Sequence, residues 1–158
     1  MKALYLLRHA ETEPPGGAGS DFERPLSAAG VATARRVADA MAARGWRPEA
    51  VLCSAAHRAI QTWQAMTPML APNVAPRILR GLYLAPPSRL LAALRRQPDN
   101  RASVLLIGHN PGIQSLAQAL AGPASAAAAM ARLRTPYPPA ALSVLDLAIG
   151  DWRALGPG

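Results

Sequence analysis

Two histidines and three arginines are placed in this sequence where they could bind one anionic group together. They are Arg8, His9, Arg24, Arg58 and His109. Arginine forks match the geometry of phosphate oxygens, and imidazoles can share in holding such a group. So many cations in one place would repel one another without an anion between them. The residue types therefore predict a phosphate-like ligand, provided the fold brings these positions together.

The predicted strands carry these residues at their ends. Apolar runs at Lys2–Leu7, Ala50–Ser54 and Ser103–Gly108 are typical of strands buried on both faces. In open α/β sheets, ligands bind beyond the carboxyl ends of the strands. Arg8-His9 closes the first run and His109 follows the third, so both are expected at the same edge of the sheet.

Helices are predicted between the strands. Ser27 is a suitable N-cap, and Gly45 a suitable C-terminal stop, for a helix over Ala28–Arg44. The segment Thr12–Pro25 is rich in Pro, Gly and Ser and reads as a loop that ends near Arg24. Further helices are expected at about Ala56–Leu70, which places Arg58 in a first turn, at Pro87–Arg96, at about Pro111–Leu120 and within 126–129, whereas 73–84 is ambiguous and could hold a short strand.

Alternating strands and helices predict an α/β fold, a three-layer α/β/α sandwich with a mostly parallel central sheet. Ala141–Leu147 and Asp151–Leu155 flank Gly150, a pattern typical of a C-terminal antiparallel hairpin. The 158 residues contain no repeat or linker, so we expect one domain over 1–158.

Composition excludes several classes of protein. The single cysteine, Cys53, leaves no disulfide framework and no Cys-based zinc site, and we expect it to be a buried small apolar residue. No apolar stretch approaches the roughly 18 residues of a membrane helix, and Arg8 and His9 interrupt any signal-peptide core. We therefore expect a cytoplasmic protein, of bacterial composition, with no membrane association.

The charge balance is strongly basic, with 17 Lys and Arg against 9 Asp and Glu, for a net charge of +8. Such a surface favours anionic partners, although an Ala-, Arg- and Pro-rich composition can also reflect coding bias. Nucleic acid is not expected, because no aromatic residues interleave with a basic cluster as stacking platforms. Trp46, Trp63 and Trp152 are expected to be packing residues.

Four blocks of the sequence resemble the histidine phosphatase (phosphoglycerate mutase-like) superfamily. They are Leu6-Leu7-Arg8-His9-Ala10-Glu11; Asp21 followed by Arg24-Pro25-Leu26-Ser27; Ser54 followed by Arg58-Ala59 and Gln61-Thr62; and Ile107-Gly108-His109-Asn110-Pro111. The second block and the short chain are similar to the SixA-type phosphohistidine phosphatase branch. The resemblance covers nearly the whole chain and implies a phosphoglycerate mutase-like fold.

The resemblance implies a role for each matching residue. His9 would be the nucleophile that takes up the phosphoryl group, and water would then hydrolyse the phosphohistidine intermediate. Arg8, Arg24 and Arg58 would hold the phosphoryl oxygens, with His109 sharing that task as charge spreads in the transition state. No metal and no cofactor are implied.

Two positions depart from the family pattern. Ala10 stands where glycine is usual, which keeps the residue small. Larger members protonate the leaving group with an acidic residue from mid-chain, yet Pro72–Pro98 contains no Asp or Glu. Asp21 is the best placed of the remaining acids, which also include Glu11, Glu13 and Glu23, although its alternative is loop or cap hydrogen bonding. A weak or absent acid favours a labile phosphoramidate substrate.

Several alternatives stay open from the sequence. The substrate could be protein phosphohistidine or a small phosphorylated metabolite, and a non-catalytic phosphate-binding or docking module is also possible. A metallohydrolase on His9, His57 and His109 is disfavoured, because nearby arginines would repel a divalent cation, and we interpret His57 as a rim residue. Arg24 could simply pair with Asp21 or Glu23. We expect a monomer.

Overall fold

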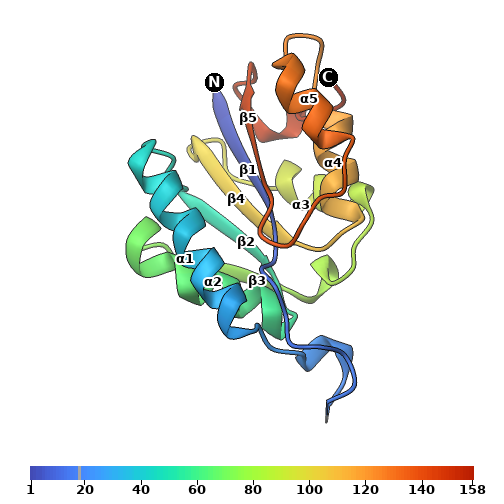
Figure 1. Ribbon diagram of the computed structural model, residues 1–158. Helices are drawn as coiled ribbons and strands as arrows, with labels where there is room; N and C mark the ends of the chain where they lie inside the picture. The colour runs from blue at the N-terminus through green and yellow to red at the C-terminus, as the bar shows by residue number, and fades with distance from the viewer. Residues whose placement is uncertain (18) are drawn as a thin grey trace.

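A five-stranded sheet runs through the centre of the molecule (Figure 1). The computed structural model describes residues 1–17 and 19–158. The strands are β1 (Lys2–Arg8), β2 (Ala50–Ser54), β3 (Pro76–Leu79), β4 (Ser103–Gly108) and β5 (Leu142–Leu147). Their order in the sheet is β3-β2-β4-β1-β5, with every pair parallel except β1 and β5. The three strands predicted from apolar runs are the three inner strands.

Helices cover both faces of this sheet (Figure 1). On one face lie α1 (Ala28–Ala43) and α2 (His57–Leu70), and on the other α3 (Pro87–Arg95), α4 (Gly112–Leu120) and α5 (Ala127–Leu133). Three 3-10 helices complete the elements: η1 (Asp21–Glu23), η2 (Arg80–Leu82) and η3 (Trp152–Ala154). The three-layer α/β/α architecture predicted from the sequence is confirmed.

The alternation of side chains along the inner strands builds the two cores. Successive strand residues point to opposite faces of a sheet. Tyr5 and Leu7 of β1 therefore pack with α1 and α2, whereas Leu4 and Leu6 pack with α3 and α4. All four side chains are buried, and each such burial contributes about 1.5–3 kcal/mol. The runs are apolar at every position because both faces are covered.

The prediction of a C-terminal hairpin is wrong for its second strand. β5 is antiparallel, as predicted, but its partner is β1, and Asp151–Leu155 forms η3 and its C-cap instead of a strand. The Trp152 side chain is fully buried on the α3 side, and its Nε1 donates to the Arg101 carbonyl at 2.8 Å. The Asp151 carboxylate accepts the Arg153 N–H at 2.7 Å, which caps the short helix. Burial of the large Trp152 ring stabilises the chain more than the strand that the alternating polar and apolar residues suggested.

The start of α1 ties this helix to the chain that leaves β1. Ser27 Oγ accepts the Gly30 N–H at 3.0 Å, which confirms the predicted N-cap. A Cβ at Gly30 would stand 2.0 Å from the Glu11 carbonyl oxygen, so only glycine allows the helix to pass this close. Gly45 has φ of +71° and ends the helix as predicted. The ambiguous segment 73–84 forms β3 and η2.

Cys53 and the tryptophans were expected to be packing residues, and the structure shows where they lie. Cys53 is buried within β2, and burial raises the pKa of its thiol to about 12, which fits a packing role. Trp63 and Trp152 are buried, and Trp46 packs against the core at its edge. In the part of the chain that the structure describes, no helix is both long and apolar enough to cross a membrane.

Candidate active site

The two histidines meet at the carboxyl ends of adjacent strands. Arg8 and Gly108 are partners in the parallel register of β1 and β4, so His9 and His109 leave the sheet side by side. The His9 N–H donates to the Gly108 carbonyl at 3.0 Å, which continues the ladder one residue further. The two imidazole centroids are 5.2 Å apart. Parallel pairing of two strands distant in the sequence therefore creates the site.

A pocket of about 400 Å³ opens at this edge. All six residues singled out from the sequence line it, together with a few neighbours. The lining consists of Arg8, His9, Glu11, Thr12, Asp21, Arg24, Arg58, Leu84, His109, Asn110 and Pro139. His57 is exposed and lies outside the pocket, with its Nδ1 3.1 Å from the Glu23 carbonyl. The structure thus separates His57 from the other two histidines.

His9 is held so that one ring nitrogen keeps the lone pair that a nucleophile needs. Its Nδ1 lies 2.8 Å from the Ala10 carbonyl, which can only accept, so the proton is on Nδ1 and Nε2 keeps its lone pair. Arg58 Nε donates to Nε2 at 3.3 Å. Burial lowers the pKa of His9 to about 4, and the charges of Arg58 and Arg8 add to that effect. The imidazole is therefore neutral at pH 7 and nucleophilic at Nε2.

The arginines are oriented by the protein rather than left free. Arg8 Nη1 donates to the Tyr137 carbonyl at 2.7 Å, while the Arg8 Nε is buried without a partner among the residues that the structure describes. Arg24 Nη1 donates to Thr12 Oγ1. Burial and the nearby Arg58 charge lower the pKa of Arg8, yet a guanidinium stays protonated. The result is a set of fixed positive charges around the His9 ring.

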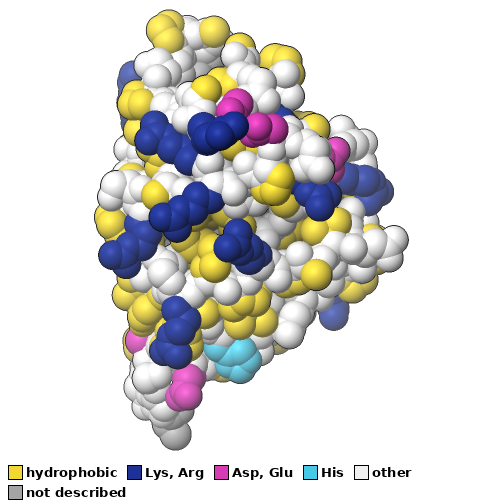
Figure 2. Space-filling model, turned by 180° about the vertical axis from the view of Figure 1, so that it is seen from behind, with side chains coloured by type: hydrophobic (Ala, Val, Ile, Leu, Met, Phe, Trp, Pro, Cys, Tyr) yellow, Lys and Arg dark blue, Asp and Glu magenta, His cyan; other side chains and the backbone are white. Residues whose placement is uncertain are grey.

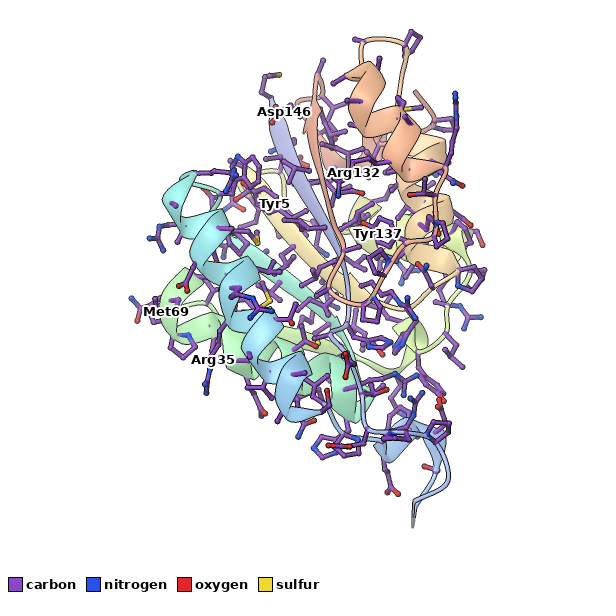
Figure 3. The ribbon with its side chains drawn as sticks, in the orientation of Figure 1. Tyr5, Arg35, Met69, Arg132, Tyr137 and Asp146 are labelled. Atoms are coloured by element: carbon purple, nitrogen blue, oxygen red, sulfur yellow. The ribbon has the colours of Figure 1, made fainter. Side chains whose placement is uncertain are left out.

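Tyr137 is itself anchored in the core, which explains how it can fix Arg8. In Figure 3 its side chain is labelled in the region between the sheet and α4. Its hydroxyl donates to the Leu6 carbonyl at 3.2 Å and lies 2.8 Å from Ser143 Oγ. The segment before β5 is thereby held against β1, so its carbonyl meets the Arg8 guanidinium.

The Asp21 carboxylate joins the arginines at the mouth of the pocket. It accepts hydrogen bonds from Tyr83 Oη at 2.6 Å, Arg24 Nη2 at 2.9 Å and Arg58 Nη2 at 3.1 Å. The hydrogen bond from Tyr83, followed by that from Arg24, holds the pKa of Asp21 well below its usual range. The side chain is 49% exposed, so this carboxylate is both ionised and accessible to solvent. It carries no proton to donate at neutral pH.

His109 lies deeper than His9 and has fewer partners. Its Nε2 is 2.7 Å from Ser54 Oγ, and its Nδ1 is buried with no partner in the described part of the chain. The ring packs edge-on against Tyr83, with centroids 5.5 Å apart. Burial lowers the pKa of His109 to about 3, and His9 and Arg58 contribute to that shift. His109 is therefore a neutral ring at pH 7.

The remaining residues of the Ser54–Thr62 block tie α2 to the loop that carries Arg24. Thr62 Oγ1 accepts the Ala10 N–H at 3.0 Å and donates to the Arg58 carbonyl at 2.7 Å. Gln61 Oε1 accepts the Leu26 N–H at 2.7 Å. These bonds fix the distance between the end of β1 and the first turn of α2. Arg58 is held against His9 as a consequence.

Sequence reasoning missed Tyr83 and the specific task of Ser54. Tyr83 contacts both Asp21 and His109, although it lies in a segment with no recognisable pocket pattern. No motif places this tyrosine at the site. Ser54 was recognised as part of a motif, but its hydrogen bond to His109 was not predicted. The two residues are 55 positions apart in the sequence and meet only because β2 pairs with β4.

Comparison with known proteins agrees with this geometry. A family model described as histidine phosphatase superfamily (branch 1) matches residues 4–82. The chain belongs to this superfamily. An uncharacterized protein of Mycobacterium tuberculosis is 35% identical over 153 residues, which cover 96% of this chain and 93% of the relative. As a member of the histidine phosphatases, the protein is a phosphatase.

Solved structures of this superfamily share the fold along almost the whole chain. One from Agrobacterium tumefaciens, assigned as a phosphohistidine phosphatase SixA, is 33% identical with a TM-score of 0.82, covering 92% of this chain and 91% of that one. Another with the same assignment, from Nakamurella multipartitia, is 29% identical with a TM-score of 0.78, covering 99% and 91%. This histidine phosphatase therefore has structural neighbours of the SixA type.

Ala10 fits the histidine phosphatase site in place of the usual glycine. Its side chain is fully buried in the core cluster below the pocket. Its carbonyl accepts from His9 Nδ1 and its N–H donates to Thr62, so the backbone of this residue performs both polar tasks. Among residues 1–17 and 19–158, no cluster of three or more His, Cys, Asp or Glu side chains is arranged to hold a metal ion.

Proposed function

We propose that this phosphatase removes the phosphoryl group from phosphohistidine on proteins, with His9 carrying that group between two chemical steps. The observation that carries the proposal is the state of His9. Its Nε2 bears a lone pair, is neutral, and lies within a ring of fixed guanidinium groups. Such preorganised charge stabilises the negative charge that spreads over phosphoryl oxygens during transfer.

The reaction needs two displacements at phosphorus. His9 Nε2 attacks, the new N–P bond forms, and the P–N bond of the substrate breaks. The substrate nitrogen leaves with the bonding electron pair and takes up a proton from water. A second water then attacks phospho-His9, releasing inorganic phosphate and returning the electron pair to Nε2. Arg8, Arg24 and Arg58 would hold the phosphoryl oxygens in both steps, and His109 would share this task.

The chemistry of Asp21 favours a substrate with a nitrogen leaving group. A positioned general acid typically contributes about 10²–10⁴-fold, chiefly where the leaving group is a poor one. Hydrogen bonds from Tyr83 and two arginines lower the pKa of Asp21 and keep its carboxylate ionised, so it supplies no such proton. A phosphoramidate nitrogen is protonated readily in water, so its cleavage does not depend on an enzyme acid. The Asp21 carboxylate can instead accept an N–H of the leaving imidazole.

The surface beside the site supports a protein substrate rather than a metabolite. Residues 50–98 contain no Asp or Glu. Two exposed arginines of this stretch, Arg80 in η2 and Arg89 near the start of α3, form what we name the arginine face. None of the ion pairs among the described residues includes them. Figure 2 shows the molecule from behind. On this side, Lys and Arg side chains (dark blue) are spread over much of the surface, whereas Asp and Glu side chains (magenta) lie only in its upper and lower parts.

The arginine face lies next to the short helix that carries Asp21, one of the residues that line the pocket. The Arg80 guanidinium lies 5.2 Å from the Phe22 ring centroid, one residue from Asp21. Arg89 Cδ comes within 3.9 Å of where a Cβ of Gly81 would stand, so α3 and η2 present their arginines together. A small metabolite fills the pocket and never reaches this surface. An acidic phosphoprotein contacts both, and its charge steers association.

A substrate panel tests the proposal. It contains a histidine-phosphorylated protein, a phosphohistidine peptide, an aryl phosphate and a sugar phosphate. We expect kcat/KM for both phosphohistidine substrates to exceed that for the sugar phosphate by about 10²-fold or more, because its poor alkoxide leaving group would need an acid catalyst. The aryl phosphate, whose leaving group needs no acid, should fall less far behind. Faster turnover of the sugar phosphate would favour a metabolite phosphatase, and binding of inorganic phosphate without turnover of any substrate would favour a docking module.

A further inference from the structure

Ser54 and His109 form a buried pair next to the candidate nucleophile. Ser54 ends β2, His109 follows β4, and the parallel pairing of these strands brings both to the same edge. Ser54 Oγ lies 2.7 Å from His109 Nε2, and both residues are buried. At this depth, water cannot substitute for either partner, so the direction of the hydrogen bond is set by the protein.

The other hydrogen bonds of Ser54 decide that direction. Ser54 Oγ accepts the Ala56 N–H at 3.2 Å. Among the described residues, its hydroxyl proton has one acceptor within reach, His109 Nε2. If Nε2 carried the proton instead, the Ser54 hydroxyl proton and the His109 Nδ1 lone pair would both be buried without partners. Each unsatisfied buried polar group destabilises the fold, so the arrangement that leaves only one such group is favoured.

In the favoured arrangement, the one buried polar group left without a hydrogen-bond partner is the Nδ1–H of His109. This atom is buried and has no partner among residues 1–17 and 19–158, and His109 is among the residues that line the pocket beside His9. Buried polar hydrogens without an acceptor are rare in folded proteins and often mark a ligand position. A phosphoryl oxygen transferred to His9 would be such an acceptor.

We propose that Ser54 is a positioning residue that fixes the Nδ1–H tautomer of His109, so that a preformed donor faces the phosphoryl group. Ser54 itself is not among the residues that line the pocket. The neutral state of His109, whose pKa burial lowers to about 3, is consistent with a ring that donates without being charged. The catalytic consequence rests on the proposed function, whereas the tautomer itself does not.

The nitrogen spectrum of the three histidines tests the tautomer directly. In a long-range ¹H–¹⁵N correlation spectrum at pH 7, we expect His109 to show a protonated Nδ1 and an unprotonated Nε2, with the signals assigned by their loss in His109→Gln. Adding inorganic phosphate is expected to shift the Nδ1 signal of His109. A wild-type His109 with its proton on Nε2 overturns the proposal without any variant at Ser54.

Variants then test the catalytic consequence. We expect Ser54→Ala to give a mixture of His109 tautomers and to lower kcat by about 10–100-fold with a smaller change in KM, somewhat less than the ~10²–10³-fold loss for removing a donor outright. Ser54→Thr, which keeps a hydroxyl, should recover most of kcat. Cys53→Ala, which removes a neighbouring buried side chain on the opposite face of β2, is the control and should change neither property.

The possible results separate the two claims. An unaltered tautomer or an unaltered kcat in Ser54→Ala contradicts the positioning role. Wild-type protein that shows the Nδ1–H tautomer and a phosphate-dependent shift, yet hydrolyses no phosphoramidate, leaves the role of Ser54 in phosphate binding intact and overturns the proposed function instead.

Discussion

Arg58 Nε donates a hydrogen bond to His9 Nε2 at 3.3 Å, so the guanidinium occupies the lone pair of the candidate nucleophile in the free protein. The other two nitrogens of Arg58 hold the Asp21 carbonyl and carboxylate. A bound phosphoryl group would take over these donors from Asp21 and expose Nε2 for attack. In the free protein Arg58 thus helps to keep His9 neutral and oriented, and we expect it to bind the phosphoryl group in the complex.

We expect Arg58→Lys to be nearly as damaging as Arg58→Ala. Lysine keeps the charge but offers no planar fork that could reach His9 and the phosphoryl oxygens together. Both variants should lower kcat/KM by about 10²–10³-fold on a phosphohistidine peptide. Thermal unfolding of each variant serves as the control for folding. A lysine variant with wild-type activity would show that charge alone suffices.

Asp21→Asn should have little effect on the chemical step. The Asp21 carboxylate is ionised and has no proton to donate, so replacing it with an amide removes no acid catalyst. We expect kcat on a phosphohistidine peptide to fall less than ~10-fold, well short of the ~10²–10⁴-fold contribution of a general acid. Inorganic phosphate should bind the variant more tightly, because a competing anion has left Arg24 and Arg58. A loss of 10²-fold or more in kcat, by the same scale, would identify Asp21 as the acid.

The pH profile of kcat/KM should lack the usual histidine limb near pH 6.5. His9 must be unprotonated at Nε2 to attack, and its pKa is lowered to about 4. Because the pKa falls, the reactive neutral form persists to lower pH, and activity should decline only as the pH approaches about 4. The profile is measured on a phosphohistidine peptide and corrected for ionisation of the substrate. A limb centred near 6.5 would contradict this account of His9.

Charge reversal on the arginine face should separate protein substrates from small ones. Arg80→Glu/Arg89→Glu is expected to lower kcat/KM for an acidic histidine-phosphorylated protein by about 10-fold or more at low salt, and less at high salt. Turnover of a short phosphohistidine peptide should be unchanged. Neither residue touches the pocket.

The matched control reverses the same charge elsewhere. Arg35→Glu/Arg36→Glu lies on exposed positions of α1, across the sheet from α3, and Arg35 is labelled in Figure 3. This pair should leave both substrates almost unaffected. Equal losses from the two pairs would indicate a general effect of net charge, and loss of DNA binding in place of protein turnover would indicate a different anionic partner.

The sequence was sufficient where a single physical signal dominates. β4 is apolar at every position because helices cover both of its faces, and Ser27 and Gly45 mark the ends of α1 by local chemistry. His9 and His109 could be placed together because strands of a parallel sheet end at one edge. These inferences use neighbours in the chain or a general rule of topology.

Tertiary packing decided what the sequence could not show. Trp152 lies in an alternating stretch, but its ring is buried under α3 and draws 152–154 into a short helix. Tyr83 reaches Asp21 and His109 from a loop whose course depends on β3 and η2. The low pKa of Asp21 follows first from the hydrogen bond of Tyr83, which no motif indicates, and then from that of Arg24 in its own motif. Such features depend on distances between residues far apart in the chain.

The measurement that tests the central claim most directly is trapping of the enzyme during turnover. Wild-type protein mixed with a phosphoramidate labelled in its phosphoryl group is quenched within the first turnovers and digested. We predict one labelled peptide, containing His9, with a label that is stable to base and lost in acid, and no label in His9→Ala. Label at another residue, or turnover by His9→Ala at the wild-type rate, would contradict the account.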